Sequence, residues 1–476
     1  MTKAVMNRHF AGSLTAHDCK RYIPHEFIVP AGCGRIDIDF RYAPQRVQGI
    51  KNLLTLTLFD PHGFRGARHR SGTEQHVTLS ATEVTPGYVP GPLLAGTWIV
   101  EVDPHMVMPG ETVRYTLDVG LTVGVRGATA ESFPPHQRMP AVARWQPGWY
   151  RGDLHTHSDH SDAHDFAIAD LIQLARDTKL DFVFLTDHNT ISGLPEMDAS
   201  ASETLLAAGG IELTTYWGHA LCLGAREWVD WRMRPGSGDM ARVAAAAYAQ
   251  GQIFVIAHPQ ADGEPACTGC SWRFGEMMPG NARVVEVWNG PWSGDSNNEK
   301  ALALWYDWLN QGLRLAATAG SDAHGPRDYA SAPGFNVIYA RALSEAALLE
   351  GVLAGRLYLS SGPQITFQAQ SADGVTCGIG DTVTQSATFA VHWRDCPSDA
   401  EVRVIVNGRL LCALPAGIEG VHTWMLTPAQ ADWVTVEIRD QNGVLLAVTN
   451  PIFIHSEFMP AAFTSPSSQN SPPPAP

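Results

Sequence analysis

The chain has 476 residues, of which 45% are hydrophobic and 17% are charged, so its composition is that of a globular protein with several domains. Its 48 acidic and 33 basic residues give a formal net charge of -15. This balance argues against nucleic acid as the main partner, because proteins that bind phosphate backbones are usually basic.

The amino-terminal residues show no secretory signal, and no apolar run in the sequence is long enough to span a bilayer. The eight cysteines are scattered, which suits a reducing compartment, and we therefore expect a cytoplasmic protein without a membrane segment. Cys267 and Cys270 are the one close pair. Because no second pair with this spacing is present, we interpret them as two ordinary thiols of a loop rather than half of a zinc site.

Residues 1–148 are predicted to form an N-terminal β-sandwich followed by a linker rich in Pro and Gln. Apolar and polar residues alternate, as in half-buried strands, in the segments 35–42, 54–58, 98–102 and 113–119. The turn residues Asp60-Pro-His-Gly63 and Pro109-Gly110 separate these segments. Nothing in this region has the pattern of a catalytic site.

Residues 149–362 have a different sequence pattern from residues 1–148, because short apolar strands alternate there with helical segments. The predicted strands cover 180–185, 253–257, 284–287 and 315–318. Helical spacing of apolar residues is present in 167–175, 240–250, 298–310 and 344–354. This alternation predicts an α/β fold, either layered or barrel-shaped, with parallel strands.

Residues 363–457 are predicted to form a second, C-terminal β-sandwich domain. Its clearest strands are 388–393, 402–406 and 433–438. Asn407-Gly408 and Asn442-Gly443 are hairpin signals. The tail 458–476 is rich in Ser and Pro, cannot bury a core, and is expected to be disordered.

Side chains of the metal-ligand type recur where the central strands are predicted to end. His155 and His157 follow the segment 150–154, and at alternate strand positions both imidazoles face the same side and reach one ion. Such a pair is weak evidence alone, but the pattern recurs later in the chain. The further residues are Asp162, His188, Glu212, His219, His258, Asp322 and His324. Since parallel strands carry their chemistry at the carboxyl edge, we predict a metal centre there.

The motifs in this order resemble the PHP (polymerase and histidinol phosphatase) superfamily: Asp153-Leu-His-Thr-His157, Ser161-Asp162, Thr186-Asp-His188, Glu212, His258-Pro259 and Ser321-Asp-Ala-His324. The resemblance covers about residues 149–362 and implies a distorted, seven-stranded β/α barrel. The segments 210–219 and 285–290, together with flanking β domains, narrow the likeness to the CehA/McbA branch. That branch is named after carbaryl hydrolases, which cleave aryl N-methylcarbamates.

The resemblance also implies two or three divalent metal ions per chain and a division of their ligands. The first ion would be held by His155, His157, Glu212 and Asp322. Glu212 would bridge to a second ion held by His219 and His258, and a third position would use Asp162, His188 and His324. Asp162 stands where some trinuclear members carry histidine. Nitrogen and oxygen ligands suit Zn²⁺, Mn²⁺ or Fe²⁺, and the sequence does not choose among them.

A centre of this kind activates water and polarises a substrate oxygen, so we predict hydrolysis of an ester-type bond. Asp322 would accept the proton of the water or act only as a ligand, and His188 or His324 would protonate the leaving oxygen. No G-x-S-x-G nucleophile motif competes with this interpretation.

Two kinds of small-molecule substrate stay open. An aryl N-methylcarbamate or aryl ester, cleaved to release the aromatic alcohol, would need aromatic walls, for which Trp217, Trp288 and Trp292 are the candidates. A phosphoester would need a cation, for which Arg273 is the candidate in the loop after His258. The scarcity of basic residues near the motifs favours the carbamate or aryl ester. A phosphoesterase is the alternative, a non-catalytic metal-stabilised binding protein is a second one, and oligomerisation stays possible.

Overall fold

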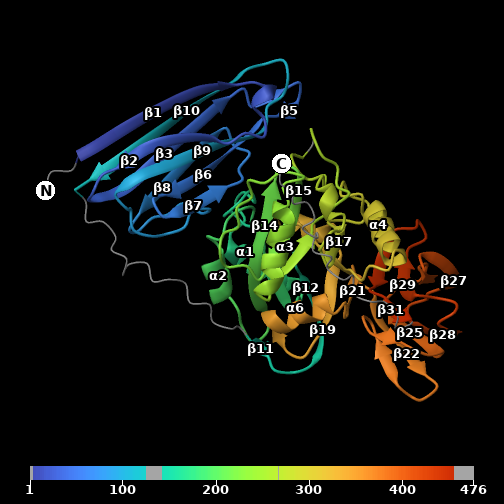
Figure 1. The fold of residues 1–476 in the computed structure, drawn as a ribbon. Helices are drawn as coiled ribbons and strands as arrows, with labels where there is room; N and C mark the ends of the chain where they lie inside the picture. The colour runs from blue at the N-terminus through green and yellow to red at the C-terminus, as the bar shows by residue number, and fades with distance from the viewer. Residues whose placement is uncertain (1–3, 125–141, 266, 455–476) are drawn as a thin grey trace, which may run out of the picture.

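The structure, a computed structural model, describes residues 4–124, 142–265 and 267–454 (Figure 1). The fold is mixed α/β and rich in sheet, with few helices. All-β regions lie at both ends of the chain, and the helices are concentrated between them (Figure 1). Most of the predicted linker and the tail predicted to be disordered lie outside the described residues.

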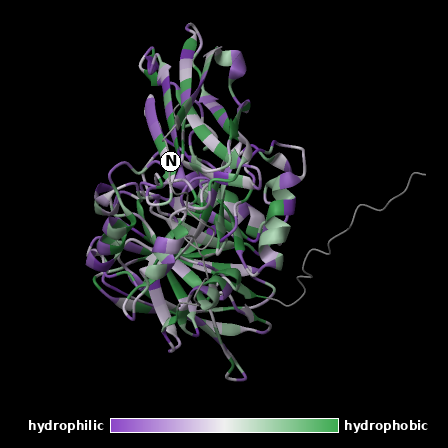
Figure 2. Cartoon of the chain, turned by 90° about the vertical axis from the view of Figure 1, so that its left-hand side faces the viewer, coloured by the Kyte–Doolittle hydropathy of each residue, from purple (hydrophilic) through white to green (hydrophobic). Residues whose placement is uncertain are grey.

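Two antiparallel four-stranded sheets form the N-terminal region. One sheet has the order β1 (Ala4–Leu14), β10 (Val113–Val123), β3 (Cys33–Ala43), β8 (Glu74–Ser80), and the other β2 (Ile23–Val29), β9 (Gly96–Met106), β6 (Leu53–Asp60), β7 (Gly63–Arg68). The four strands predicted here are all confirmed, with longer bounds. Alternate residues such as Ile36, Ile38 and Phe40 are fully buried between the sheets, and the strands are banded by hydropathy in Figure 2.

The N-terminal region also contains a short β-hairpin that was not predicted, with two residues in each strand. It consists of β4 (Arg46–Val47) and β5 (Ile50–Lys51). Gln48 and Gly49 connect the two strands with φ values of 51° and 83°. Positive φ at both central residues is the geometry of the tight turns whose twist matches that of paired strands. A short 3-10 helix covers Ala16–Asp18 in the same region.

The central sheet contains two groups of parallel strands. The first is β12 (Gly148–Asp153), β13 (Phe182–Leu185) and β14 (Leu206–Thr215), and the second is β16 (Ile253–Ile256), β17 (Val284–Asn289) and β18 (Ala316–Gly320). Between them, β15 (Gly218–Leu223) pairs antiparallel with both β14 and β16. The strands predicted in this region are confirmed, whereas the β14–β15 hairpin was not foreseen.

The carboxyl ends of the outer strands β12 and β18 approach each other. Thr156 and Ala323 form an isolated parallel bridge, and the His157 N–H donates to the Ala323 carbonyl at 2.9 Å. Antiparallel β19 (Phe335–Ala340) and β21 (Leu357–Ser360) continue the sheet beyond β12. Among the described residues β12 and β18 share no continuous ladder, so the closed barrel stays a prediction.

All four predicted helices are confirmed within three residues at each end. They are α1 (Ile168–Asp177), α3 (Asp239–Ala249), α4 (Asn298–Asn310) and α6 (Glu345–Leu353). In α1 the buried residues Ile168, Leu171, Ile172 and Ala175 follow helical spacing, so one face packs on the sheet. Shorter elements are α2 (Leu194–Ala199), α5 (Pro326–Ala330), a 3-10 helix at Gly275–Met277, and the strands β11 (Val142–Arg144) and β20 (Leu343–Ser344), which pair. No helix among the described residues has the length and apolar character needed to cross a membrane.

The C-terminal region buries its core between two groups of strands. One is the sheet β23 (Thr376–Gly378), β22 (Gln364–Ser371), β25 (Ala387–Arg394), β28 (Gly420–Leu426). The other comprises β30 (Leu445–Thr449), β29 (Trp433–Arg439), β26 (Glu401–Val406) and β27 (Arg409–Pro415), with β24 (Thr382–Val383) and β31 (Ile452–Ile454). The three predicted strands are confirmed.

The second group of C-terminal strands continues the central sheet rather than forming a separate layer. β21 pairs antiparallel with β30, so that Tyr358 lies opposite Thr449. The Asn450 side chain also pairs with the main chain of Ala317 in β18, at 2.8 and 2.9 Å. The sheet therefore crosses the boundary predicted at residue 362, and the predicted domain limits stay predictions.

Candidate metal centre

All nine predicted ligands come together at the carboxyl end of the central strands. His155 and His157 follow β12, His188 follows β13, His258 follows β16, and Asp322 and His324 follow β18. The expectation that every ligand follows a strand is wrong for Glu212 and His219, which lie inside β14 and β15. The antiparallel hairpin explains the difference, because it returns the chain over the strand end and carries both side chains to the same place.

The first group of ligand atoms consists of His155, His157 and Asp322. His157 Nε2 lies 2.9 Å and His155 Nε2 lies 3.5 Å from Asp322 Oδ1. Both Nε2 atoms also lie 3.4 Å from Glu212 Oε2. Glu212 therefore contacts both imidazoles of this group, although it does not itself belong to the group.

Glu212 contacts several imidazoles at once, which fits the bridging position expected for it. Its Oε1 lies 2.9 Å from His219 Nδ1 and 3.2 Å from His258 Nε2. Its Oε2 lies 2.8 Å from His188 Nδ1. His155, Glu212 and His258 form a second group of converging ligand atoms, and His219 lies beside this group.

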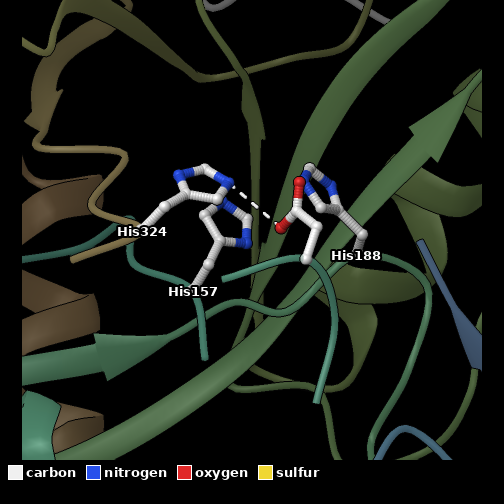
Figure 3. Close-up of side chains that lie close together, drawn as sticks. His157, His188 and His324 are labelled. Atoms are coloured by element: carbon white, nitrogen blue, oxygen red, sulfur yellow. Dashed lines mark ion pairs between the residues drawn. The ribbon is translucent and has the colours of Figure 1, made fainter. Parts of the chain in front are cut away.

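The third group contains Asp162, His188 and His324, as expected, and also His157 (Figure 3). Asp162 lies 3.0 Å from His324 Nε2 and 3.5 Å from His188 Nε2. The His157 ring stacks between the other two imidazoles, with centroid distances of 4.3 Å to His188 and 4.4 Å to His324. His157 therefore faces both the first and the third group.

Several buried ligand atoms make no hydrogen bond of good geometry among the described residues, although His157 Nε2 and Glu212 Oε2 lie within ion-pair distance of Asp322 and His188. The atoms without such a bond are His155 Nε2, both ring nitrogens of His157, Glu212 Oε2, His219 Nε2 and His258 Nδ1. A buried polar atom without a partner costs about 1–3 kcal/mol, so a cluster of them is unfavourable unless something else binds it. Imidazole nitrogens and carboxylate oxygens are the donors that divalent first-row metals accept, and these residues therefore fit such ions.

The charges of the cluster keep its carboxylates ionised. Burial raises the pKa of Glu212, but the positive charges of His188 and His155 outweigh it and hold the pKa well below its ordinary value. Burial likewise raises the pKa of Asp322, and His155 and His157 reverse this effect. Both carboxylates are therefore available as anionic ligands.

Glu286, to which the sequence analysis assigned no role, orients two ligands. Its Oε1 lies 3.0 Å from His155 Nδ1, and its Oε2 accepts the main-chain N–H of His258 at 3.0 Å and the Asn289 side chain at 3.2 Å. Metal-binding histidines typically use their second ring nitrogen in this way. The signal in the sequence was a carboxylate inside the otherwise apolar strand β17.

The main chain is strained at two of the ligands. His258 has φ 28° and Asp322 has φ 53°, values that residues with a side chain rarely adopt. His258 comes shortly after the short strand β16, and Asp322 comes shortly after β18. Strain of this kind persists where the surroundings fix it, and it is commonly found at functional sites.

A cavity of about 700 Å³ opens onto the cluster. Its lining includes seven of the nine ligands, namely Asp162, His188, Glu212, His219, His258, Asp322 and His324. The N-terminal region contributes the rest of one wall, including Arg46, Lys51, His69 and Met106. The sequence shows no catalytic pattern in the N-terminal region, and its part in the cavity wall was not predicted, because such patterns do not reveal residues that join a site only in the folded chain.

None of the four side chains predicted to contact substrate lines this cavity. Trp288 and Trp292 are buried in the core, with ring centroids 5.1 Å apart, and the Trp288 indole N–H donates to the Gly290 carbonyl. Trp217 is covered by Lys20, whose Nζ lies 4.0 Å from the ring centroid. Arg273 is exposed outside the cavity. The tryptophans pack the core, which is the commoner use of this residue.

Cys267 and Cys270, interpreted above as two thiols, are joined in a disulfide. The loop between them brings their Cα atoms to 5.6 Å, a separation that a disulfide spans. Both cysteines line the cavity. Gly269 has φ 81°, and a Cβ there would lie 2.1 Å from the Thr215 carbonyl oxygen, so the loop is closely packed on the β14–β15 hairpin.

No protein-family model and no curated protein matches the chain. Among solved structures, one similar chain is a two-domain protein from Bacteroides vulgatus containing a predicted PHP-like metal-dependent phosphoesterase. It is 16% identical, the alignment covers 66% of this chain and 99% of that one, and the TM-score is 0.36. Another is the CARDB domain of a Pyrococcus furiosus protein, with 21% identity over 20% of this chain and 95% of that one and a TM-score of 0.14. The function is therefore argued from the site itself.

Proposed function

We propose that this chain is a metal-dependent hydrolase of the PHP type that cleaves an ester-type bond in a small molecule with metal-activated water. The observation that carries the proposal is the convergence of buried imidazole and carboxylate atoms at the end of the central strands, several of them without a hydrogen bond. A purely structural cluster would leave ring nitrogens such as His219 Nε2 and His258 Nδ1 unpaired, whereas a metal centre requires such atoms.

The residues that would hold the ions are the nine described above. Divalent ions there would lower the pKa of bound water and polarise an oxygen of the substrate. The three converging groups support two or three ions per chain, and their mixed nitrogen and oxygen donors suit zinc, manganese or iron.

Three of these side chains are placed to handle protons. Asp322 lines the cavity with 28% of its side chain exposed, so it can accept a proton from water at Oδ1 or Oδ2. His324 is 36% exposed and His188 is 8% exposed, and both line the cavity. Where the third position holds no ion and the imidazoles are free to carry a proton, the greater access favours His324 over His188 as the proton donor to the leaving oxygen.

The cavity wall favours an anionic phosphoester over an aryl N-methylcarbamate. The tryptophans that would have formed an aromatic wall lie elsewhere, whereas Arg46 and Lys51 line the cavity. Guanidinium and ammonium groups bind phosphoryl oxygens through charge-assisted hydrogen bonds. We therefore place a phosphoester first and the carbamate or aryl ester, favoured by the sequence, second.

The test combines metal analysis with a parallel assay of 4-nitrophenyl phosphate and 1-naphthyl N-methylcarbamate. We expect bound transition metal, loss of hydrolysis after chelation, and its return when Mn²⁺ or Zn²⁺ is added back. Full activity in the metal-free protein would overturn the metal-dependent mechanism. Turnover of the carbamate alone would reverse the order of the two substrates.

Single-residue variants test whether the proposed metal ligands, rather than histidines elsewhere in the chain, are needed for activity. His155→Ala should lose most of kcat together with bound metal, because His155 faces two of the three ligand groups. His9→Ala is the matched control, since His9 is an exposed histidine of β1 outside the cavity. A His155→Ala protein with wild-type rate and metal content would remove His155 from the centre.

A further inference from the structure

The N-terminal sheets reach the candidate metal centre through the residues that follow β7. The His69 ring lies 4.8 Å from the ring of His188, a proposed ligand, and 4.7 Å from that of His105. His69 lines the cavity, and its ring nitrogens have no hydrogen-bond partner among the described residues. A polar group from a separate region thus faces the same space as the ligands.

The two residues next to His69 in the chain, Arg68 and Arg70, hold it in position through hydrogen bonds. Arg68 and Arg70 both donate to the Asp159 carbonyl, at 3.1 and 3.2 Å. Asp159 belongs to the same loop as Asp162, a proposed ligand of the third ion. The two arginines therefore attach this segment of the N-terminal region directly to the ligand loop.

The β4–β5 hairpin adds positive charge to the same wall. Arg46 and Lys51 lie opposite each other in the hairpin pairing, and both line the cavity. Arg46 Nη1 donates to the Gly49 carbonyl at 2.7 Å, which holds its guanidinium near the turn. Neither side chain forms an ion pair with a described carboxylate, so both charges are available to a ligand.

Another part of the cavity lining, called the rim below, is negatively charged. Asp262 and Asp295 line it from loops of the central region. Asp262 accepts from Asn297 Nδ2 at 2.9 Å, and no described cation pairs with either carboxylate. A substrate with a second negative group would be repelled from this rim and attracted to Arg46 and Lys51, so the cavity orients such a molecule.

We infer that the N-terminal region is part of the active site and selects substrates that carry a second anionic group away from the bond that is cleaved. Arg46 and Lys51 bind that distal group while the metal centre engages the ester. This inference rests on the proposed hydrolase function. It assigns the hairpin a role in specificity, and it explains why positive charge is placed at the cavity mouth of an acidic protein.

The kinetic test compares two substrates of the same shape whose distal groups differ in charge, 4-carboxyphenyl phosphate and its neutral amide, 4-carbamoylphenyl phosphate. For the metal-loaded protein we expect kcat/KM to favour the carboxylate by about tenfold or more, as a charge-assisted contact supplies. In Arg46→Gln/Lys51→Gln the ratio should fall by about tenfold or more from the wild-type value, because both cations are lost. The control Arg41→Gln/Arg114→Gln removes two exposed arginines outside the cavity and should keep the ratio.

A binding test keeps the inference separate from hydrolysis. Calorimetric titration of the metal-loaded protein with 4-phosphonobenzoate and with 4-phosphonobenzamide compares the same distal charges without turnover. Tighter binding of the benzoate that disappears in Arg46→Gln/Lys51→Gln supports the inference, even if neither phosphate ester is hydrolysed and the proposed function fails. Equal affinities in the wild-type protein, or a preference that survives in the double variant, would overturn it.

Discussion

Glu286 Oε1 lies 3.0 Å from Nδ1 of His155, and through its other oxygen Glu286 also fixes the main chain of His258. One carboxylate thus orients two proposed metal ligands, one that follows β12 and one that follows β16. Both contacts are fully buried, so water does not replace them when they are lost.

Glu286→Gln should weaken metal binding without unfolding the protein. The amide keeps the size of the side chain but loses the negative charge that holds the His155 ring, and loss of such a partner typically costs about 10–100-fold in metal affinity. Competition titration with a chromogenic chelator measures the effect. Glu26→Gln, at an exposed position of β2, is the control. Unchanged affinity in Glu286→Gln would show that Glu286 does not tune the centre.

Metal ions should stabilise the fold, and more so at higher pH. In the metal-free protein, burial lowers the pKa of His324, but Asp162 outweighs it and raises the pKa to about 10, and the pKa of His188 is also raised. Metal must displace these protons, so its affinity falls as pH falls. The rise in Tm on adding Mn²⁺ or Zn²⁺ should therefore be larger at pH 8 than at pH 6. Calorimetry measures both values, and a rise independent of pH would contradict the assignment.

His69→Ala should impair turnover while leaving the metal content intact. His69 lies outside the three ligand groups, but its unpaired ring nitrogens face the cavity. Loss of one neutral hydrogen bond to substrate would lower kcat/KM by roughly 3- to 10-fold. Steady-state kinetics and metal analysis on the same preparation separate the two effects. His76→Ala, at an exposed position of β8, serves as the control. A loss of metal in His69→Ala would instead make His69 a ligand.

Asp103→Asn should stabilise the protein at neutral pH. Burial and then the neighbouring Glu101 raise the pKa of Asp103 well above its ordinary value. Folding therefore disfavours the ionised form, so the destabilisation is absent below the unfolded pKa and grows as pH rises towards the folded pKa. The variant should gain on the order of 1–3 kcal/mol at pH 8 and little at pH 4. Urea unfolding at both pH values measures the gain; a gain of the same size at pH 4 would exclude this cause.

The periodicity of the sequence was sufficient to predict the helices α1, α3, α4 and α6 and the strands confirmed above, because hydrophobic spacing decides which backbone geometry can bury a face. His258 and Asp322 could be found because each comes just after a buried strand. The β14–β15 hairpin was not foreseen. Its two strands carry Gly, Glu, Thr and His among their apolar residues, so they lack the continuous apolar run by which the other buried strands are recognised.

The side chains that the N-terminal region contributes to the cavity could not be predicted from the sequence. His69, Arg46 and Lys51 lie more than 80 residues before the nearest ligand in the sequence, and no local pattern links them to it. The tryptophans misled for a different reason, because their place in or near the motif segments did not reveal that Trp288 packs in the core. Tertiary packing decides which residues line a cavity, and neither composition nor local sequence pattern predicts this.

The pairing of β21 with β30 has a consequence for shortened forms of the chain. A protein ending near residue 362 would expose the hydrogen-bonding edge of β21, and such open edges recruit strands from other molecules. It would also lose Asn450, whose amide completes the main-chain bonding of Ala317 only a few residues before Asp322. The carboxyl-terminal strands thus protect the sheet against aggregation, and an excised central region should be aggregation-prone even with every metal ligand in place.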